Sequence, residues 1–316
     1  MAALSEREAR VVRQHVAAAG DADGARVVQW HGASSVLRDG RLWVHRDNGR
    51  RQAMQELFFH AVWSVANTLT CSHTLKFWDL RRHATPRETA RLQGFPDAFV
   101  LPRARYNRLL ANAVAVPCAR FACSRVCDAA CRTMVDLCAG VGGFAFAARG
   151  ACPGIRCVGF SEVLPAASEC YRDNFPGVRA LGDARAVSVW PRCDLLTCGF
   201  PCQPFSSCLS RARRSGHTQR DFYRVVLDAV RETGASRVVL ENVPAFQTTG
   251  RAQWDALCAE LRAMGFALDA AVLDARDFGL PQARRRLYLV GARRGRPQPL
   301  AAYEPTPRTT LASLLE

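Results

Sequence analysis

The sequence contains no run of about 18 apolar residues, so no part of it is long enough to form a membrane-spanning helix. Its first residues, Met1 to Gln14, are charged and lack the apolar stretch of a secretory signal peptide. It also has no internal repeat and no low-complexity tract. These absences lead us to expect a soluble intracellular protein, of cytoplasm or nucleus, with no membrane partner and with reduced cysteines.

The 14 cysteines follow no regular disulfide spacing, and no Cys-x-x-Cys pair occurs among them. Cys123, Cys127 and Cys131 recur every four residues, a spacing that would place them on one helical face, and Cys118 lies five residues before them. A metal site at this set is the alternative, but no histidine lies nearby. We therefore expect small core residues and no metal.

Acidic residues are scarce relative to basic ones. Lys and Arg number 43 against 28 Asp and Glu, which gives a formal net charge of +15. This excess favours a polyanionic partner, because each phosphate that a protein neutralises releases counterions. A basic surface without such a partner fits the charge equally well.

From about residue 133 to 293, short apolar segments alternate with helical patterns. The alternation predicts an α/β domain whose mostly parallel sheet is covered on both faces. The expected strands are residues 134–137, 155–160, 195–198, 238–240 and 287–290, and the clearest helices are 222–232 and 254–264.

The part before residue 133 is less regular. Thr85 as N-cap, Pro86 at the first helical position and Glu88 three residues after the cap predict a helix over 85–92. Further upstream the patterns predict helices at 5–19 and 51–66, a strand-like stretch at 26–46, and strand and turn at 65–78.

A glycine-rich turn at residues 135–144 leaves one expected strand and enters a helix. Glycines there let a ligand approach the backbone, and a helix N-terminus favours a carboxylate. Glu162 follows the next strand and could bind ribose hydroxyls, and Asp183 could accept a bond from an adenine amino group. A helix cap or a surface charge is the ordinary alternative for each acid. No Gly-Lys-Ser/Thr follows the turn, which disfavours a nucleoside triphosphate.

A cysteine follows the third strand of this region. Cys202 lies between Pro201 and Gln203-Pro204, and prolines fix the backbone where a reactive group must be aimed. A thiol becomes nucleophilic in positive surroundings, and the next residues are polar and rich in arginine, as in a lid. A buried structural cysteine is the alternative, but such turn chemistry does not suit a core.

Two further segments place charge at strand ends. Glu241 lies at the end of one expected strand, where α/β sheets bind their ligands. Arg284 and Arg286 precede the last strand and alternate with Arg285 onto one side. A solvated charge run is the isolated interpretation of these arginines, but together with Cys202 they indicate a catalytic cluster.

These segments together resemble the cytosine-C5 methyltransferase family over most of residues 83–316. The turn at 136–144 is similar to the family's cofactor motif, and Gly-Phe-Pro-Cys-Gln-Pro-Phe-Ser at 199–206 to its nucleophile motif. Glu241-Asn242-Val243 and Gln282-x-Arg284-x-Arg286 resemble its remaining catalytic motifs. The implied fold is a Rossmann-like, S-adenosylmethionine-dependent methyltransferase with a small N-terminal target-recognition lobe.

The order of the motifs departs from that family. Residues 85–96 resemble its ninth motif and residues 111–114 its tenth, and both usually follow the arginine motif. We therefore infer a circular permutation, which is tolerated where chain termini lie close together. The expected division is a target-recognition region with the ninth motif at 1–105, and a catalytic domain at 106–316.

The resemblance implies roles for individual residues. The catalytic residues would be Cys202, Glu241, Arg284 and Arg286. The residues that bind S-adenosyl-L-methionine would be Asp136, Cys138, Ala139, Gly140, Gly142, Gly143, Phe144, Glu162, Val163, Asp183, Pro201, Asn112 and Ala113. Those on DNA would be Gln203, Ser206, Arg211, Arg213 and Arg220. Cys138 and Val163 stand where the family often has larger side chains around the adenine, so the adenine is expected to pack differently.

The implied reaction is methylation of cytosine C5 in duplex DNA. The thiolate of Cys202 would add to C6 of a base that is flipped out of the duplex, and Glu241 would bond its N3 edge. Methylation of tRNA by the same chemistry is one alternative, and a catalytically silent DNA-binding regulator is another. The short recognition region leaves room for a second subunit, and the oligomeric state stays open.

Overall fold

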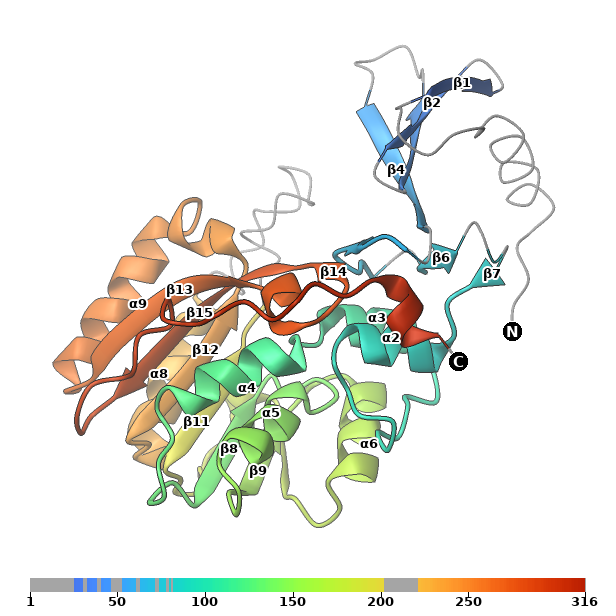
Figure 1. Ribbon diagram of the computed structural model, residues 1–316. Helices are drawn as coiled ribbons and strands as arrows, with labels where there is room; N and C mark the ends of the chain where they lie inside the picture. The colour runs from blue at the N-terminus through green and yellow to red at the C-terminus, as the bar shows by residue number, and fades with distance from the viewer. Residues whose placement is uncertain are drawn as a thin grey trace.

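The computed structural model describes most of the chain from residue 26 onward. The described ranges are 26–30, 33–38, 41–46, 53–60, 63–71, 74–77, 80, 82–201 and 221–315, with side chains from His60 onward. Within them, the N-terminal part forms a six-stranded sheet and the remainder a seven-stranded sheet, which stand apart in Figure 1. The helix expected at 5–19 lies outside the described residues.

The seven-stranded sheet has the order β10-β9-β8-β11-β12-β15-β13. Its strands are β8 (Thr133–Leu137), β9 (Arg156–Ser161), β10 (Ala180–Gly182), β11 (Leu195–Gly199), β12 (Arg237–Asn242), β13 (Ala267–Asp274) and β15 (Arg285–Ala292). All neighbours pair in parallel except β15, which is antiparallel to both β12 and β13. The α/β fold with a mostly parallel sheet is thus confirmed.

Helices cover both faces of this sheet (Figure 1). They are α4 (Val116–Ser124), α5 (Gly143–Ala151), α6 (Pro165–Asn174), α8 (Phe222–Thr233) and α9 (Arg251–Ala263). The first three pack into one apolar cluster, which includes Ala119 and Val239, and the last two into another, which includes Val226 and Val238. Adjacent valines of β12 join opposite clusters because successive side chains of a strand point to opposite faces.

The N-terminal sheet corrects one predicted helix. Residues 53–60 form strand β4 (Ala53–His60), which pairs antiparallel with β3 (Arg41–Arg46), and no helix covers residues 53–60 or 63–66. Met, Gln, Glu and Leu in this segment favour a helix locally, but ladder pairing with a neighbouring strand overrides that preference. The strand-like expectation for 26–46 is confirmed by β1 (Arg26–Trp30), β2 (Ala33–Arg38) and β3.

Short elements join the two sheets. Strands β6 (Lys76–Phe77) and β7 (Arg82–His83) complete the N-terminal sheet, while β5 (Ala66–Asn67) pairs in parallel with β14 (Gln282–Ala283). The strand-and-turn expectation for residues 65–78 is therefore confirmed in outline. The chain then continues into α2 (Pro86–Leu92) and α3 (Tyr106–Asn112), and single-turn helices lie at 184–186, 244–247, 275–278 and 311–314.

Helix α2 begins as its sequence predicts. The Thr85 hydroxyl accepts a hydrogen bond from the Glu88 N–H (3.1 Å), and the Glu88 carboxylate accepts one from the Thr85 N–H (2.8 Å). Arg82 neutralises this fully buried carboxylate through two hydrogen bonds of 2.7 Å. Both the capping box and a buried ion pair therefore fix the start of the helix.

The cysteines after α3 are core residues, but they do not share one helical face. Cys118, Cys123 and Cys131 are buried in the apolar cluster on the α4 side, as expected. Helix α4 ends at Ser124, so Cys127 and Cys131 lie in the connection to β8 rather than on the helix. The described part of the chain contains no cluster of three metal-ligating side chains.

The division near residue 105 stays a prediction. Ala90, Phe95 and Phe99 precede that point, yet they pack in the same cluster as α4 and α5. By its packing, the segment at 85–96 therefore belongs with the helices that cover the seven-stranded sheet. No helix in the described ranges is long and apolar enough to cross a bilayer.

Candidate active site

The candidate site lies at one edge of the seven-stranded sheet. The chain runs from β8 outward to β9 and β10 and then crosses back to β11 on the other side of β8, which makes a topological switch point. Open α/β sheets bind ligands at the carboxyl ends of strands beside such a point. Because β15 is antiparallel, its first residues lie at this same edge.

Glu241 and Arg286 form an ion pair at this edge. Glu241 lies near the end of β12, and its Oε1 is 3.2 Å from Nε of Arg286 on β15. Burial raises the pKa of Glu241, while the guanidinium groups of Arg286 and Arg284 act in the opposite direction. A buried carboxyl with a raised pKa, beside fixed positive charge, suits proton sharing with a reacting base.

The end of β11 lies beside this ion pair. Gly199 is the register partner of Glu241 in the parallel pairing of β11 with β12, and a methyl group on Gly199 would be in van der Waals contact with Oε2 of Glu241, at 3.5 Å. Phe200 follows, buried and edge-on to Phe246 at 5.2 Å, and its carbonyl accepts a hydrogen bond from Asn242 (3.4 Å). The end of β11 that leads to Pro201 is therefore held by the ring of Phe246 and by the side chain of Asn242.

Pro201 is the last described residue before the gap at 202–220, and it is half-buried. The predicted nucleophile Cys202 lies outside the described residues. So do the predicted DNA-binding residues Gln203, Ser206, Arg211, Arg213 and Arg220.

Arg284 has a different environment from Arg286. Its buried guanidinium donates to the carbonyl oxygens of Ala111 (3.1 Å) and Ala113 (2.7 Å). Ala111 belongs to the last turn of α3 and Ala113 caps that helix, and Asn112 between them is exposed to solvent. Arg284, predicted to be catalytic, thus holds backbone next to the site, and Arg286 alone of the two pairs with Glu241.

The glycines of the turn after β8 serve different purposes. Gly140 has φ +55° and opens onto free space, as expected for a ligand's approach. A methyl group on Gly142 would come within 2.4 Å of Phe175, and one on Gly143 within 2.7 Å of Val114. A larger side chain at Gly142 or Gly143 would thus collide with the protein interior, and the predicted contact of their backbone with a ligand stays a prediction. Cys138 also has positive φ, +50°, and Ala139 and Phe144 are buried.

Asp136 is fully buried within β8. Its Oδ1 accepts a hydrogen bond from the Thr197 hydroxyl on β11 at 2.7 Å. Burial raises the pKa of Asp136 to about 8, and Thr197 opposes the shift. The carboxyl therefore joins two central strands beneath the turn rather than lining its open side.

Glu162 and its neighbours lie at the end of β9. The carboxylate accepts hydrogen bonds from the N–H groups of Gly140 and Leu164, both at 2.8 Å, and so clasps the glycine turn. Val163 is 60% exposed, an unusual state for a valine. Asp183 caps the turn at 184–186 through the Arg185 N–H (3.0 Å) and remains partly exposed.

Three buried polar residues that support the site were not predicted from the sequence. Thr197, Asn242 and Gln282 are buried and bond to groups around it. Their signal was a polar side chain in or next to an apolar strand, and Asn242 and Gln282 also lie within recognised motifs. A polar residue in such a place must find a partner, but sequence alone does not name that partner.

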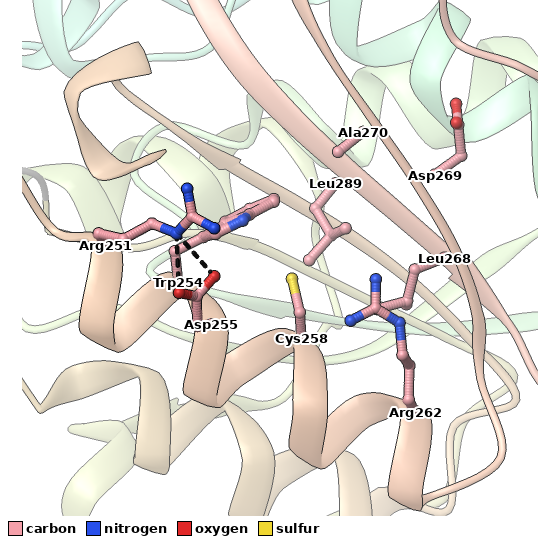
Figure 2. Close-up of a pocket in the computed structure, with 9 residues that line it drawn as sticks. All are labelled: Arg251, Trp254, Asp255, Cys258, Arg262, Leu268, Asp269, Ala270 and Leu289. Atoms are coloured by element: carbon pink, nitrogen blue, oxygen red, sulfur yellow. Dashed lines mark hydrogen bonds and ion pairs between the residues drawn. The ribbon is translucent and has the colours of Figure 1, made fainter. Parts of the chain in front are cut away.

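A surface pocket of about 380 Å³ lies elsewhere, between α9 and β13 (Figure 2). Trp254, Cys258 and Leu289 line it, and Arg251 there is paired with Asp255 at 2.7 Å. Trp254 and Leu289 also line a gap of about 10 Å³ beside Phe200 and Glu241. The pocket thus lies behind the site and presents neither Glu241 nor Arg286.

Comparison with known proteins assigns this arrangement to a family. The sequence matches the C-5 cytosine-specific DNA methylase family over residues 26–127 and 132–313. It is 32% identical over 198 residues to the type II methyltransferase M.NlaIV of Neisseria lactamica, covering 58% of this chain and 46% of that protein. It is 35% identical over 164 residues to M.NlaX of the same organism, covering 50% and 51%.

The chain thus spans about half the length of these curated relatives. Among solved structures, the Dnmt2 methyltransferase of S. pombe is similar at 22% identity with a TM-score of 0.41, covering 52% of this chain and 51% of that one. The family match covers well over half of the sequence and includes every strand of the site edge. The chain belongs to the C-5 cytosine-specific DNA methylase family.

Proposed function

We propose that the chain transfers a methyl group from S-adenosylmethionine to C5 of cytosine in duplex DNA. The observation that carries this proposal is the meeting of three motif segments at one sheet edge. Glu241 pairs with Arg286 beside Gly199, three residues before Cys202. The family gives the reaction type, and this edge is where an α/β sheet places its chemistry.

The open side of the glycine turn fits S-adenosylmethionine. Free space adjoins Gly140, and the N–H groups at the start of α5 favour the carboxylate of an amino acid. Val163 and Leu164 offer exposed apolar surface to an adenine ring. Each carboxylate oxygen of Glu162 retains a second lone pair that can accept a hydrogen bond from a ribose hydroxyl. Asp183, farther along the chain, is partly exposed. When bound, the donor supplies an electrophilic methyl group.

The chain's own residues would prepare the cytosine. The Cys202 thiolate adds to C6, and the ring electrons move toward N3, where Glu241 shares its proton. C5 then takes the methyl group, a base removes the C5 proton, and the thiolate leaves to restore the aromatic ring. Arg286 orients Glu241 and lies where the base oxygen would approach, whereas Arg284 positions the α3–α4 connection.

Duplex DNA would present its cytosine by flipping it out, which costs a few kcal/mol. The formal charge of +15 favours a polyanion, and the segment that contains Arg211, Arg213 and Arg220 would hold the displaced strands. The N-terminal sheet would serve as the target-recognition region.

We also propose that the motif order is a circular permutation. Strand β5 pairs with β14, and the Thr68 hydroxyl donates to the Ala283 carbonyl at 2.7 Å, so residues 66–68 adjoin the arginine motif. Arg91 on α2 donates to the carbonyls of Leu314 (3.0 Å) and Leu315 (3.2 Å). Segments far apart in sequence thus keep the neighbours that an unpermuted order would give them.

Bisulfite sequencing of plasmid DNA from cells that express the chain tests the function. Wild type should leave 5-methylcytosine at a fixed sequence, and Cys202→Ala should leave none. The control Cys127→Ser, in the connection between α4 and β8, should match wild type. A duplex containing 5-fluorocytosine should also become crosslinked to residue 202 in the presence of donor.

The same experiments separate the two alternatives. Methyl transfer to tRNA but not to duplex DNA would replace the proposal with an RNA methyltransferase. Binding of donor or DNA without any transfer would indicate a catalytically silent regulator.

A further inference from the structure

Gln282 is fully buried, and its amide forms hydrogen bonds with two segments that are far from it in the sequence. Its Oε1 accepts a hydrogen bond from the Leu69 N–H (3.2 Å), next to β5. Its Nε2 donates to the Leu92 carbonyl (2.9 Å), at the end of α2, and to Oε1 of Gln93 (3.3 Å). The amide therefore ties the segment after β5 and the end of the ninth-motif helix to the arginine motif.

The network continues from Gln93 toward the site. Nε2 of Gln93 donates to the Leu110 carbonyl in α3 (2.7 Å), and the Gln93 carbonyl accepts from the Val116 N–H (2.9 Å). The connection between α3 and α4 is thus held by Gln93 on one side and by Arg284 on the other. Val114 within it lies 3.7 Å from where a methyl group on Gly199 would be.

Glutamine suits position 282 for a chemical reason. Both N–H groups of its amide have acceptors, and its oxygen has a donor. Leucine would remove the hydrogen-bond partner that Gln282 gives to the Leu69 N–H and to the Leu92 carbonyl, which is unfavourable for buried polar groups. Ionised glutamate would turn a negative charge toward two acceptor oxygens.

We infer that Gln282 is a positioning residue. Through its hydrogen bonds, the position of residues 66–71 determines the positions of the α3–α4 connection and of Arg286. This inference rests on the proposed function. Substrate that engages the N-terminal sheet would then influence the Glu241–Arg286 pair through β14, which lies two residues before β15.

Kinetics of methyl transfer to a methylatable plasmid test the inference with Gln282→Leu, using Gln253→Leu on α9 as the matched control. Gln282→Leu should lower kcat about 10-fold or more and leave the Kd for S-adenosylmethionine within about twofold of wild type. Gln282→Glu should recover activity as the pH falls, because the protonated carboxyl again donates and accepts. Equal kcat in wild type and Gln282→Leu would overturn the inference.

Amide hydrogen exchange supplies a readout that does not depend on turnover. In Gln282→Leu, exchange should rise in residues 63–71 and also in 106–116. A rise confined to 63–71 would show a local structural role and would overturn the inference while leaving the proposed function intact. Failure of wild type to methylate any nucleic acid would remove the proposed function and this inference together.

Discussion

The two halves of the site edge differ in how their polar groups are satisfied. At β12 and β15, Glu241 pairs with Arg286, and Arg284 bonds to two carbonyls. At β8 and β9, Gly140 faces open space and Val163 exposes most of its side chain. The first half is closed by an ion pair and hydrogen bonds, whereas the second, although Glu162 holds its turn, leaves an open approach and an exposed apolar side chain.

This difference indicates that the two halves of the site edge have different functions. A charge arrangement that needs no rearrangement at the moment of reaction stabilises developing charge most effectively. A ligand that must enter and leave instead needs an open approach and an apolar surface to cover. Substitutions at β12–β15 should therefore affect turnover most, and those at the open side of β8–β9 should affect donor binding.

The largest expected effect is on turnover, from Glu241→Gln. The variant removes the proton that Glu241 would share with N3, so kcat should fall about 10²- to 10³-fold while the Kd of the donor stays within about twofold. Radiolabelled methyl transfer under saturating donor measures the first quantity, and calorimetric titration the second. A parallel loss of donor affinity would contradict this difference in function between the two halves.

The matched control is Glu232→Gln. Glu232 is an exposed acid in α8, on the other side of the sheet from the ion pair. This variant removes the same charge from the chain, so it should retain wild-type turnover. Loss of activity in both variants would show an effect of net charge rather than of the site.

The next largest expected effect is on the stability of the folded protein, and it tests the role of Asp136 beneath the glycine turn. Burial raises its pKa from 3.8 to about 8, so between these values the folded protein holds a proton that the unfolded chain has lost. The extra proton that the folded protein binds at Asp136 contributes to the free energy of unfolding. This contribution is complete below pH 3.8 and is lost as the pH rises through 8. Asp136→Asn lacks this loss and keeps an acceptor for the Thr197 hydroxyl.

The free energy of unfolding of Asp136→Asn, relative to wild type, should therefore increase from pH 6 to pH 8. The limiting slope is about 1.4 kcal/mol per pH unit. Denaturant unfolding at pH 6, 7, 8 and 9 measures this difference. A difference that does not vary with pH would mean that Asp136 is ionised in the folded protein.

Much of the fold was predictable because local and global preferences agree. The capping box at Thr85 and the apolar strands at β8, β9, β11 and β12 appear where the sequence places them. Strands β10 and β13 were not predicted, and β4 was predicted as a helix. Residues 53–60 carry helix-favouring side chains, and 267–274 contain three alanines and two aspartates, so pairing with a neighbouring strand decided both against local preference.

The site was predictable in its composition but less so in its contacts. Strand-end positions brought Glu241 and Arg286 together as expected: Glu241 lies near the end of β12 and Arg286 near the start of β15, and these ends share an edge because the two strands are antiparallel. The interior packing of Gly142 and Gly143 was not visible, since it depends on Phe175 and Val114 from distant segments. The attachment of Arg284 to backbone carbonyls likewise requires knowing which segment lies beside it.

The smallest expected effect tests the open half of the comparison at Val163. Val163→Ser removes apolar surface that the adenine ring would cover, and burial of a partly covered valine contributes about 1 kcal/mol. The Kd for S-adenosylmethionine should rise about fivefold, and the free energy of unfolding should change by less than about 0.5 kcal/mol because the side chain is already 60% exposed. Val100→Ser, at a valine that is 45% exposed on a different loop, should leave the Kd unchanged. If both variants bind the donor as wild type does, the adenine lies elsewhere, and the exposed surface beside Glu162 needs another occupant.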